Sequence, residues 1–143
     1  RFSALPRTFP MVVPGGRFRE MYYWDTYWIV RGLLISDMRD TARGLVQSML
    51  DTVTQLGFFP NGGRIYYLDR SQPPLLTAMV RAVFEETRDR EWLAQALPAL
   101  EKEYKFWMLP AGGRVIEMPK LARPGKRQVL NIYCSVRKGP RPE

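Results

Sequence analysis

Two stretches of the chain carry most of the side chains that could do chemistry, and both mix aromatic rings with arginines, carboxylates and amides. The first stretch runs from Pro14 to Asp25 (PGGRFREMYYWD), and the second runs from Pro60 to Gln72 (PNGGRIYYLDRSQ). Aromatic faces stack on the C–H faces of a sugar, and carboxylate and guanidinium groups form paired hydrogen bonds with neighbouring hydroxyls. The residue types of both stretches therefore suit a carbohydrate ligand.

A purely structural interpretation of the first stretch is also open. Asp25 would then stabilise the positive N-terminal end of a helix, and Trp24 and Tyr27 would belong to the core. Residue types alone favour this interpretation, because runs of aromatic residues most often pack inside a protein.

The elements that must position both stretches are helices. The sequence predicts nearly all-round apolar helices at 24–36 and 75–84, each directly after one of the two stretches. Helices with a single apolar stripe are predicted at 41–56 and 91–108, and Gly57 suits the end of the first of these. This alternation predicts two helical layers, with both stretches converging on one concave site. The apolar helices should be buried on most sides, so we expect neighbouring helices beyond these four.

The two ends of the chain have a different character from the helical part. Residues 1–13 are predicted to be an extended lead-in, because Pro6 and Pro10 disfavour a helix there. Apolar segments at 114–118 and 128–136 are predicted to be short strands or extended pieces. We therefore expect an all-α fold with a short extended C-terminal segment, organised as a lead-in (1–13), a helical core with two loops (14–108) and an irregular basic tail (109–143).

Composition excludes several kinds of chemistry. The 143 residues include one cysteine and no histidine, which excludes an internal disulfide and leaves no obvious zinc site or Ser-His catalysis. No apolar run is long enough to span a membrane, and no charged-then-apolar leader is evident. The net charge is +8, but seven Lys or Arg and a single acid lie from Lys120 onward, so the tail holds most of the excess. Nucleic acid is therefore not an expected partner, although binding through a basic tail stays open.

The residue sequences of the two stretches, and their order along the chain, resemble those of one known family. Residues 14–27 resemble the first signature of the trehalases, glycoside hydrolase family 37, and residues 60–74 are similar to the next block of that family. The resemblance continues through residues 103–108 and returns at 139–143. Two long blocks in the right order make chance agreement very improbable.

The resemblance implies a partial (α/α)6 toroid that hydrolyses α,α-trehalose to two glucose molecules with inversion, without a cofactor or a metal. Trehalose is the expected partner, and the location in the cell stays open because the family has secreted, membrane-anchored and cytosolic members. Matching positions imply substrate-binding roles for nine residues: Arg17, Trp24, Asp25, Asn61, Arg70, Ser71, Gln72, Arg141 and Glu143. Glu20 and Asp69 fit local ion pairs or helix caps better.

The resemblance assigns no catalytic residue to this chain. Inverting hydrolysis needs two carboxyl groups about 6.5–9.5 Å apart, one as acid and one activating water. In the family the acid lies in a Gly-Trp-Asp-Phe-Ser-Ser-Arg-Trp-like segment and the base is a later Glu, and neither segment occurs here. We therefore expect the N-terminal part of a trehalase catalytic domain, inactive without the C-terminal part of the same domain. The alternatives are a truncated, non-catalytic sugar-binding module, or a helical interaction protein that uses its basic tail.

Overall fold

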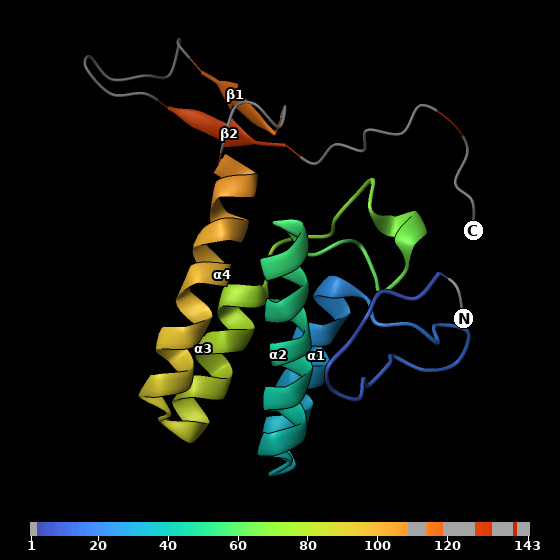
Figure 1. The fold of residues 1–143 in the computed structure, drawn as a ribbon, viewed down its shortest axis with the longest axis vertical. Helices are drawn as coiled ribbons and strands as arrows, with labels where there is room; N and C mark the ends of the chain where they lie inside the picture. Colours follow the sequence, from blue (N-terminus) through green and yellow to red (C-terminus); the bar gives the residue numbers. More distant parts are fainter. Residues whose placement is uncertain (1–2, 109–113, 119–127, 133–138, 140–143) are drawn as a thin grey trace.

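The computed structural model of the chain describes residues 3–108, 114–118, 128–132 and 139. Within these residues the fold is mostly helical, with one small antiparallel hairpin (Figure 1). The elements are α1 (Tyr23–Ile35), α2 (Arg39–Leu56), the 3-10 turn η1 (Ile65–Tyr67), α3 (Leu76–Thr87), α4 (Arg90–Met108), β1 (Val115–Glu117) and β2 (Val129–Asn131). The four helices lie close to their predicted positions.

Packing within the helical part centres on α2. α1 contacts α3, α2 contacts α4, and α2 also contacts both α1 and α3. The first loop (residues 14–22) leads into α1, and the second loop (residues 58–75) leads into α3. The C-terminal hairpin pairs Val115 with Asn131, which confirms short strands in this region, while residues 133–136 of the predicted second segment lie outside the described residues.

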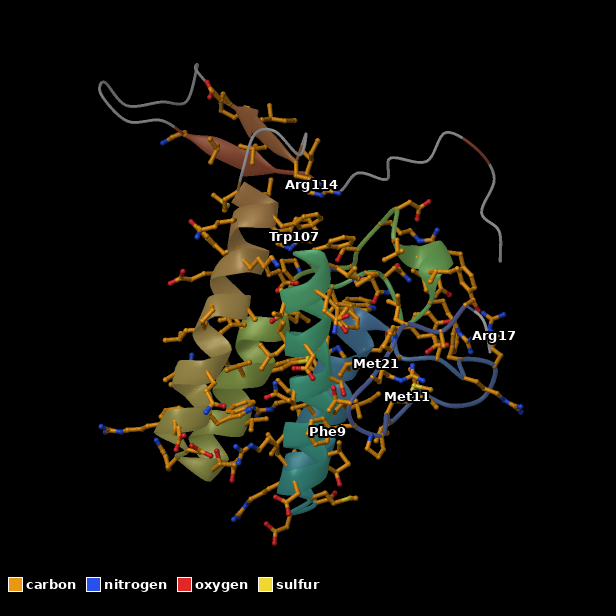
Figure 2. All side chains as sticks on the ribbon, in the orientation of Figure 1. Phe9, Met11, Arg17, Met21, Trp107 and Arg114 are labelled. Carbon is orange, nitrogen blue, oxygen red and sulfur yellow. The ribbon has the colours of Figure 1, made fainter. Side chains whose placement is uncertain are left out.

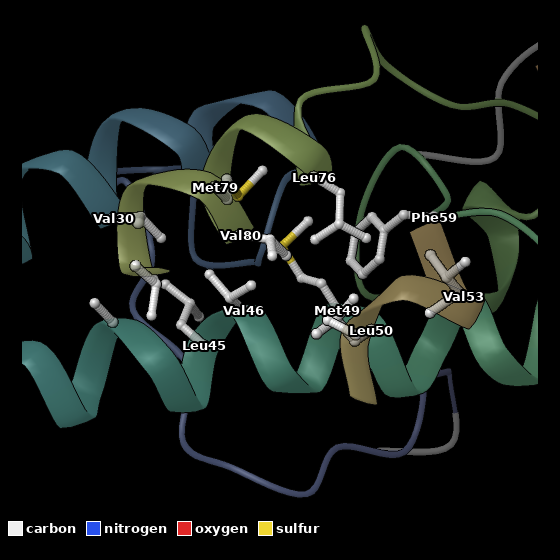
Figure 3. Close-up of a cluster of buried hydrophobic side chains, with 14 of the residues drawn as sticks. Val30, Leu45, Val46, Met49, Leu50, Val53, Phe59, Leu76, Met79 and Val80 are labelled. Atoms are coloured by element: carbon white, nitrogen blue, oxygen red, sulfur yellow. The ribbon is translucent and has the colours of Figure 1, made fainter. Parts of the chain in front are cut away.

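The core lies along α2, whose apolar stripe faces α3 and the start of the second loop. Leu45, Met49 and Val53 are fully buried. They lie beside Met79 and Val80 of α3 in the cluster that Figure 3 shows. The helix ends as predicted at Gly57, which has a φ of 89° and donates its N–H to the Val53 carbonyl at 2.8 Å. Only a residue that tolerates positive φ ends a helix in this way without strain.

Burial differs from the expectation that α2 keeps one wet face. Nine of the 18 residues of α2 are buried, and none of residues 41–53 is exposed, whereas Trp28 and Ile35 of α1 are 66% and 82% exposed. Thr8 and Phe9 of the lead-in contribute to this burial, because they contact Gly44, Ser48 and Asp51 on the face that the pattern predicts to be wet. The Phe9 ring packs on Gly44 (Figure 2), where an added Cβ would lie 3.2 Å from the ring. Thr8 also donates its hydroxyl to Asp51 at 2.8 Å.

The exposed apolar side chains of α1 agree with the expectation that these helices would show apolar faces in this chain alone. Among the described residues, every helix is too short or too polar to cross a lipid bilayer.

Candidate functional site

Both loops line one cleft at the end of the bundle where α1 and α3 begin, with a volume of about 740 Å³. Figure 2 shows Arg17 on the first loop, well to the side of the helices. The lining residues are Arg17, Phe18, Tyr22, Trp24, Asp25, Asn61, Tyr67, Arg70 and Gln72. The structure therefore gathers six of the nine residues that the sequence resemblance assigns to a substrate. The other three lining residues are aromatic, and sequence reasoning did not assign them to the site.

Hydrogen bonds between the loops set the geometry of the cleft. Tyr22 and Gly62 form an antiparallel bridge. The Tyr23 amide donates to the Asn61 carbonyl at 3.2 Å. The Trp24 amide donates to the side-chain oxygen of Gln72 at 3.1 Å. This last bond satisfies one of the amides that the first turn of a helix leaves without an internal partner. Residues almost fifty positions apart in the chain are thereby held side by side.

Glycines serve the two loops in different ways. Gly15 and Gly16 have φ values of 103° and 58°, so the first turn uses conformations that other residues rarely adopt. In the second loop, by contrast, Gly62 and Gly63 do not have positive φ. They are needed for space instead. A Cβ at Gly62 would lie 2.9 Å from both the Met21 carbonyl oxygen and the Tyr67 ring.

Gly62→Ala is therefore expected to destabilise the protein by about 2 kcal/mol, because the added methyl group forces the two loops apart. The matched control is Gly32→Ala in α1, where an added Cβ meets nothing within 4 Å. That change is expected to stabilise the protein by up to about 1 kcal/mol, since alanine favours a helix. Urea denaturation of both variants measures the difference. Equal stabilities would contradict the close approach of the two loops.

Aromatic rings hold the two arginines of the cleft. The Arg17 guanidinium lies 4.9 Å from the centre of the Phe18 ring. The Arg70 guanidinium lies 5.1 Å from that of Tyr67. Tyr67 in turn packs edge-on against Tyr22, with a ring separation of 5.9 Å. Cation–π contacts of this kind fix a planar cation while it keeps its hydrogen-bonding capacity. The cleft thus combines an aromatic wall, two guanidinium groups and one half-buried carboxylate, Asp25.

The remaining predicted residues lie elsewhere. Ser71 is absent from the cleft lining, and its hydroxyl donates to the Phe59 carbonyl at 2.6 Å. Arg141 and Glu143 lie outside the described residues. Glu20 and Asp69, which the sequence did not assign to a substrate, do not line the cleft either.

Glu20 holds the two loops together through its buried carboxylate. Its side chain is buried and forms ion pairs with Arg7 and Arg64. It also accepts the Met21 amide at 3.0 Å. The predicted ion-pair role of Glu20 is confirmed, but both partners are remote in sequence rather than local. One carboxylate therefore connects the lead-in, the first loop and the second loop.

Glu103 is a second buried carboxylate, to which the sequence analysis assigned no role. It is 4% exposed, and the Tyr23 hydroxyl lies 2.8 Å from each of its oxygens. Burial raises the pKa of Glu103 to about 6, although hydrogen bonds from Tyr23 and the Phe59 amide oppose the rise. Burial and the neighbouring carboxylate also raise the pKa of Tyr23. The signal in the sequence was an acid placed on the apolar stripe of a helix, between Ala96 and Trp107.

Glu103 predicts a pH-dependent stability. Its folded pKa of about 6 lies above the ordinary value of 4.5, so the folded state holds more protons between these values. Glu103 therefore contributes about 2 kcal/mol to the free energy of unfolding below about pH 4.5, and this contribution is lost as the pH rises through 6. The measurement is the free energy of unfolding, from urea denaturation, at pH 5 and at pH 7.5. Between these two values the unmodified protein should lose stability relative to Glu103→Gln, which cannot titrate at this position. Other carboxylates contribute equally to both proteins and cancel in this comparison, and parallel pH profiles would contradict the prediction.

Comparison with known proteins identifies the family. The trehalase family model matches residues 1–143, the whole chain. The chain belongs to the trehalase family. It is 49% identical to the trehalase of Dictyostelium discoideum over 99% of its length, and 45% identical to that of Homo sapiens over all of it. In both cases it spans 24% of the relative's own length, so it corresponds to about a quarter of each.

A solved structure of the same family supports the helical fold. The neutral trehalase Nth1 of Saccharomyces cerevisiae superimposes on 73% of this chain with a TM-score of 0.63 and 37% sequence identity. The match covers 22% of the yeast protein. The described helices therefore follow part of a trehalase fold.

Proposed function

We propose that this chain is part of an α,α-trehalase, a glycosidase that hydrolyses α,α-trehalose to two glucose molecules with inversion. The chain supplies part of the substrate pocket. One observation carries the proposal: six residues that the family resemblance assigns to substrate binding, from two separate loops, line a single cleft. Its volume of about 740 Å³ is in the range of small-molecule sites.

The chemistry of the cleft fits a disaccharide. Asp25 accepts hydrogen bonds from two neighbouring hydroxyls, and Arg17 and Arg70 donate to sugar oxygens in pairs. Trp24, which is 46% exposed, offers a face for stacking on the sugar. Asn61 and Gln72 add amide groups at the junction of the two loops. Ser71, Arg141 and Glu143 complete the proposed set, with Ser71 acting through the Phe59 carbonyl.

The catalytic pair comes from another part of the same domain. Inversion needs two carboxyl groups across the scissile bond, and Asp25 is the one acid in the cleft lining among the described residues. Asp25 also matches a sugar-binding position of the family. We therefore propose that the chain alone is inactive and that further helices close the (α/α)6 toroid. These helices would cover Trp28 and Ile35, the two most exposed apolar residues of α1.

The test is to sequence the source transcript past the codon for Glu143 and to assay the encoded protein with trehalose. We expect a Gly-Trp-Asp segment, a later Glu, and release of glucose. Inversion at one anomeric carbon of an α,α-linked sugar leaves one β-glucose and one α-glucose, so early proton NMR spectra should show both anomers equally. A stop codon directly after Glu143, or binding of trehalose without hydrolysis, would contradict the proposal and favour a sugar-binding module.

A further inference from the structure

The carboxylate of Glu103 lies in α4, outside the cleft, and yet it contacts the base of both loops. It accepts the Tyr23 hydroxyl at 2.8 Å, and the Phe59 amide stabilises its charged form. Tyr23 directly precedes Trp24 and Asp25, and Phe59 lies two positions before Asn61. A single buried group thus connects to the backbone that carries three of the cleft residues.

The Tyr23 hydroxyl extends this connection to the far end of the second loop. It accepts the Leu76 amide at 3.1 Å, in the first turn of α3, where the loop ends. The Tyr23 ring packs against Phe59 at 5.1 Å. The Phe59 carbonyl in turn accepts the Ser71 hydroxyl at 2.6 Å. Both ends of the second loop and the start of α1 therefore meet around one hydrogen-bonded centre, which consists of Tyr23, Phe59, Ser71, Leu76 and Glu103.

Burial gives this centre its rigidity. Tyr23 and Leu76 are fully buried, and Phe59 is 2% exposed. Hydrogen bonds in such surroundings are stronger than in water, and a buried donor that loses its acceptor carries the full cost of desolvation. Small displacements of the loops are therefore opposed at their bases, while their tips remain open to a ligand.

We propose that Glu103 is a positioning residue for the substrate site. By holding the hydroxyl of Tyr23, whose ring packs on Phe59 and whose oxygen accepts the Leu76 amide, it sets the first loop against the second. In this way it places Trp24, Asp25 and Asn61 relative to one another. It touches no substrate, because it does not line the cleft. The consequence for sugar binding rests on the proposed function, whereas the consequence for loop geometry does not.

Hydrogen exchange of the protein that carries this chain tests the loop geometry directly. In Glu103→Ala, we expect amides in both loops, around Trp24 and around Asn61, to exchange at least about tenfold faster, because hydrogen bonds at both loop bases are lost. Glu103→Gln keeps an acceptor oxygen, so its loop amides should exchange at rates close to those of the unmodified protein. The matched control is Gln47→Leu, which removes the 2.8 Å bond from Trp92 of α4 to α2, away from the cleft. It should leave both loops unchanged.

Steady-state kinetics with trehalose tests the consequence for the site. Glu103→Ala should raise KM by about tenfold in the folded protein, since even a 1 Å misplacement of binding groups can cost roughly a hundredfold in rate. Glu103→Gln should restore KM to within about threefold of its original value, and Gln47→Leu should not change it. A purely structural role would reduce the folded fraction and hence the apparent kcat, without moving KM.

Tyr23→Phe decides the matter if Glu103→Ala fails to fold, because it keeps the ring and removes only the hydroxyl. We expect faster exchange around Trp24 and Leu76 with Phe59 still protected. Unchanged exchange in both loops, or equal impairment by Glu103→Ala and Glu103→Gln, would overturn the positioning role. If the protein itself released no glucose, the proposed function would fail, and hydrogen exchange would still decide whether Glu103 positions the loops.

Discussion

Asp25→Ala is expected to lower kcat/KM for trehalose hydrolysis by at least about a hundredfold in the complete enzyme. The carboxylate lies in the cleft beside Trp24 and faces the site from the first turn of α1. A charged acceptor that holds two sugar hydroxyls contributes about 1.5–3 kcal/mol for each bond, and about 3 kcal/mol in total corresponds to a hundredfold. The measurement is the rate of glucose release over a range of trehalose concentrations.

Asp40→Ala is the matched control, because Asp40 occupies the first turn of α2 as Asp25 occupies that of α1. Removing an acid from the first turn of a helix costs about 0.3–1 kcal/mol of stability through the helix dipole. Both variants should show this small loss, and only Asp25→Ala should lose activity. If the two variants kept similar kcat/KM values, Asp25 would be a helix-stabilising residue and not a substrate ligand.

Glu20→Ala is expected to cause the largest loss of stability, about 3 kcal/mol, because it leaves two guanidinium groups facing each other without their carboxylate. The value is at the low end for a broken buried pair, since Arg7 and Arg64 keep 24% and 27% of their side-chain surface exposed. The loops should also separate, because Glu20 joins the lead-in to both of them. Urea denaturation gives the free energy of unfolding of each protein.

Glu85→Ala provides the comparison on the surface. Glu85 pairs with Arg81 one turn away on α3, and both side chains are largely exposed to solvent. Exposed pairs contribute little to stability, so we expect no measurable change in the denaturation midpoint. A loss for Glu85→Ala as large as that for Glu20→Ala would show that burial of the Arg7–Glu20–Arg64 cluster is unimportant.

The sequence by itself determined the local features of this protein. Helical periodicity placed the four helices, and Gly57 ends α2 with a positive φ, as its position in the sequence predicted. The residue types and their spacing in the two stretches were enough to predict the family, which the comparisons confirm. These features are readable because helix periodicity, turn chemistry and signature spacing each depend on residues a few positions apart.

The tertiary structure alone decided which distant residues meet. It showed that Thr8 and Phe9 pack on α2, that Gly62 is required by the approach of Met21 and Tyr67, and that Glu20 binds two remote arginines. It also paired Tyr23 with Glu103, 80 positions further along the chain. Such contacts depend on how packed helices and loops approach through space, which spacing along the chain does not encode. Tertiary packing therefore decided how the cleft is held together, while local sequence decided which side chains its loops carry.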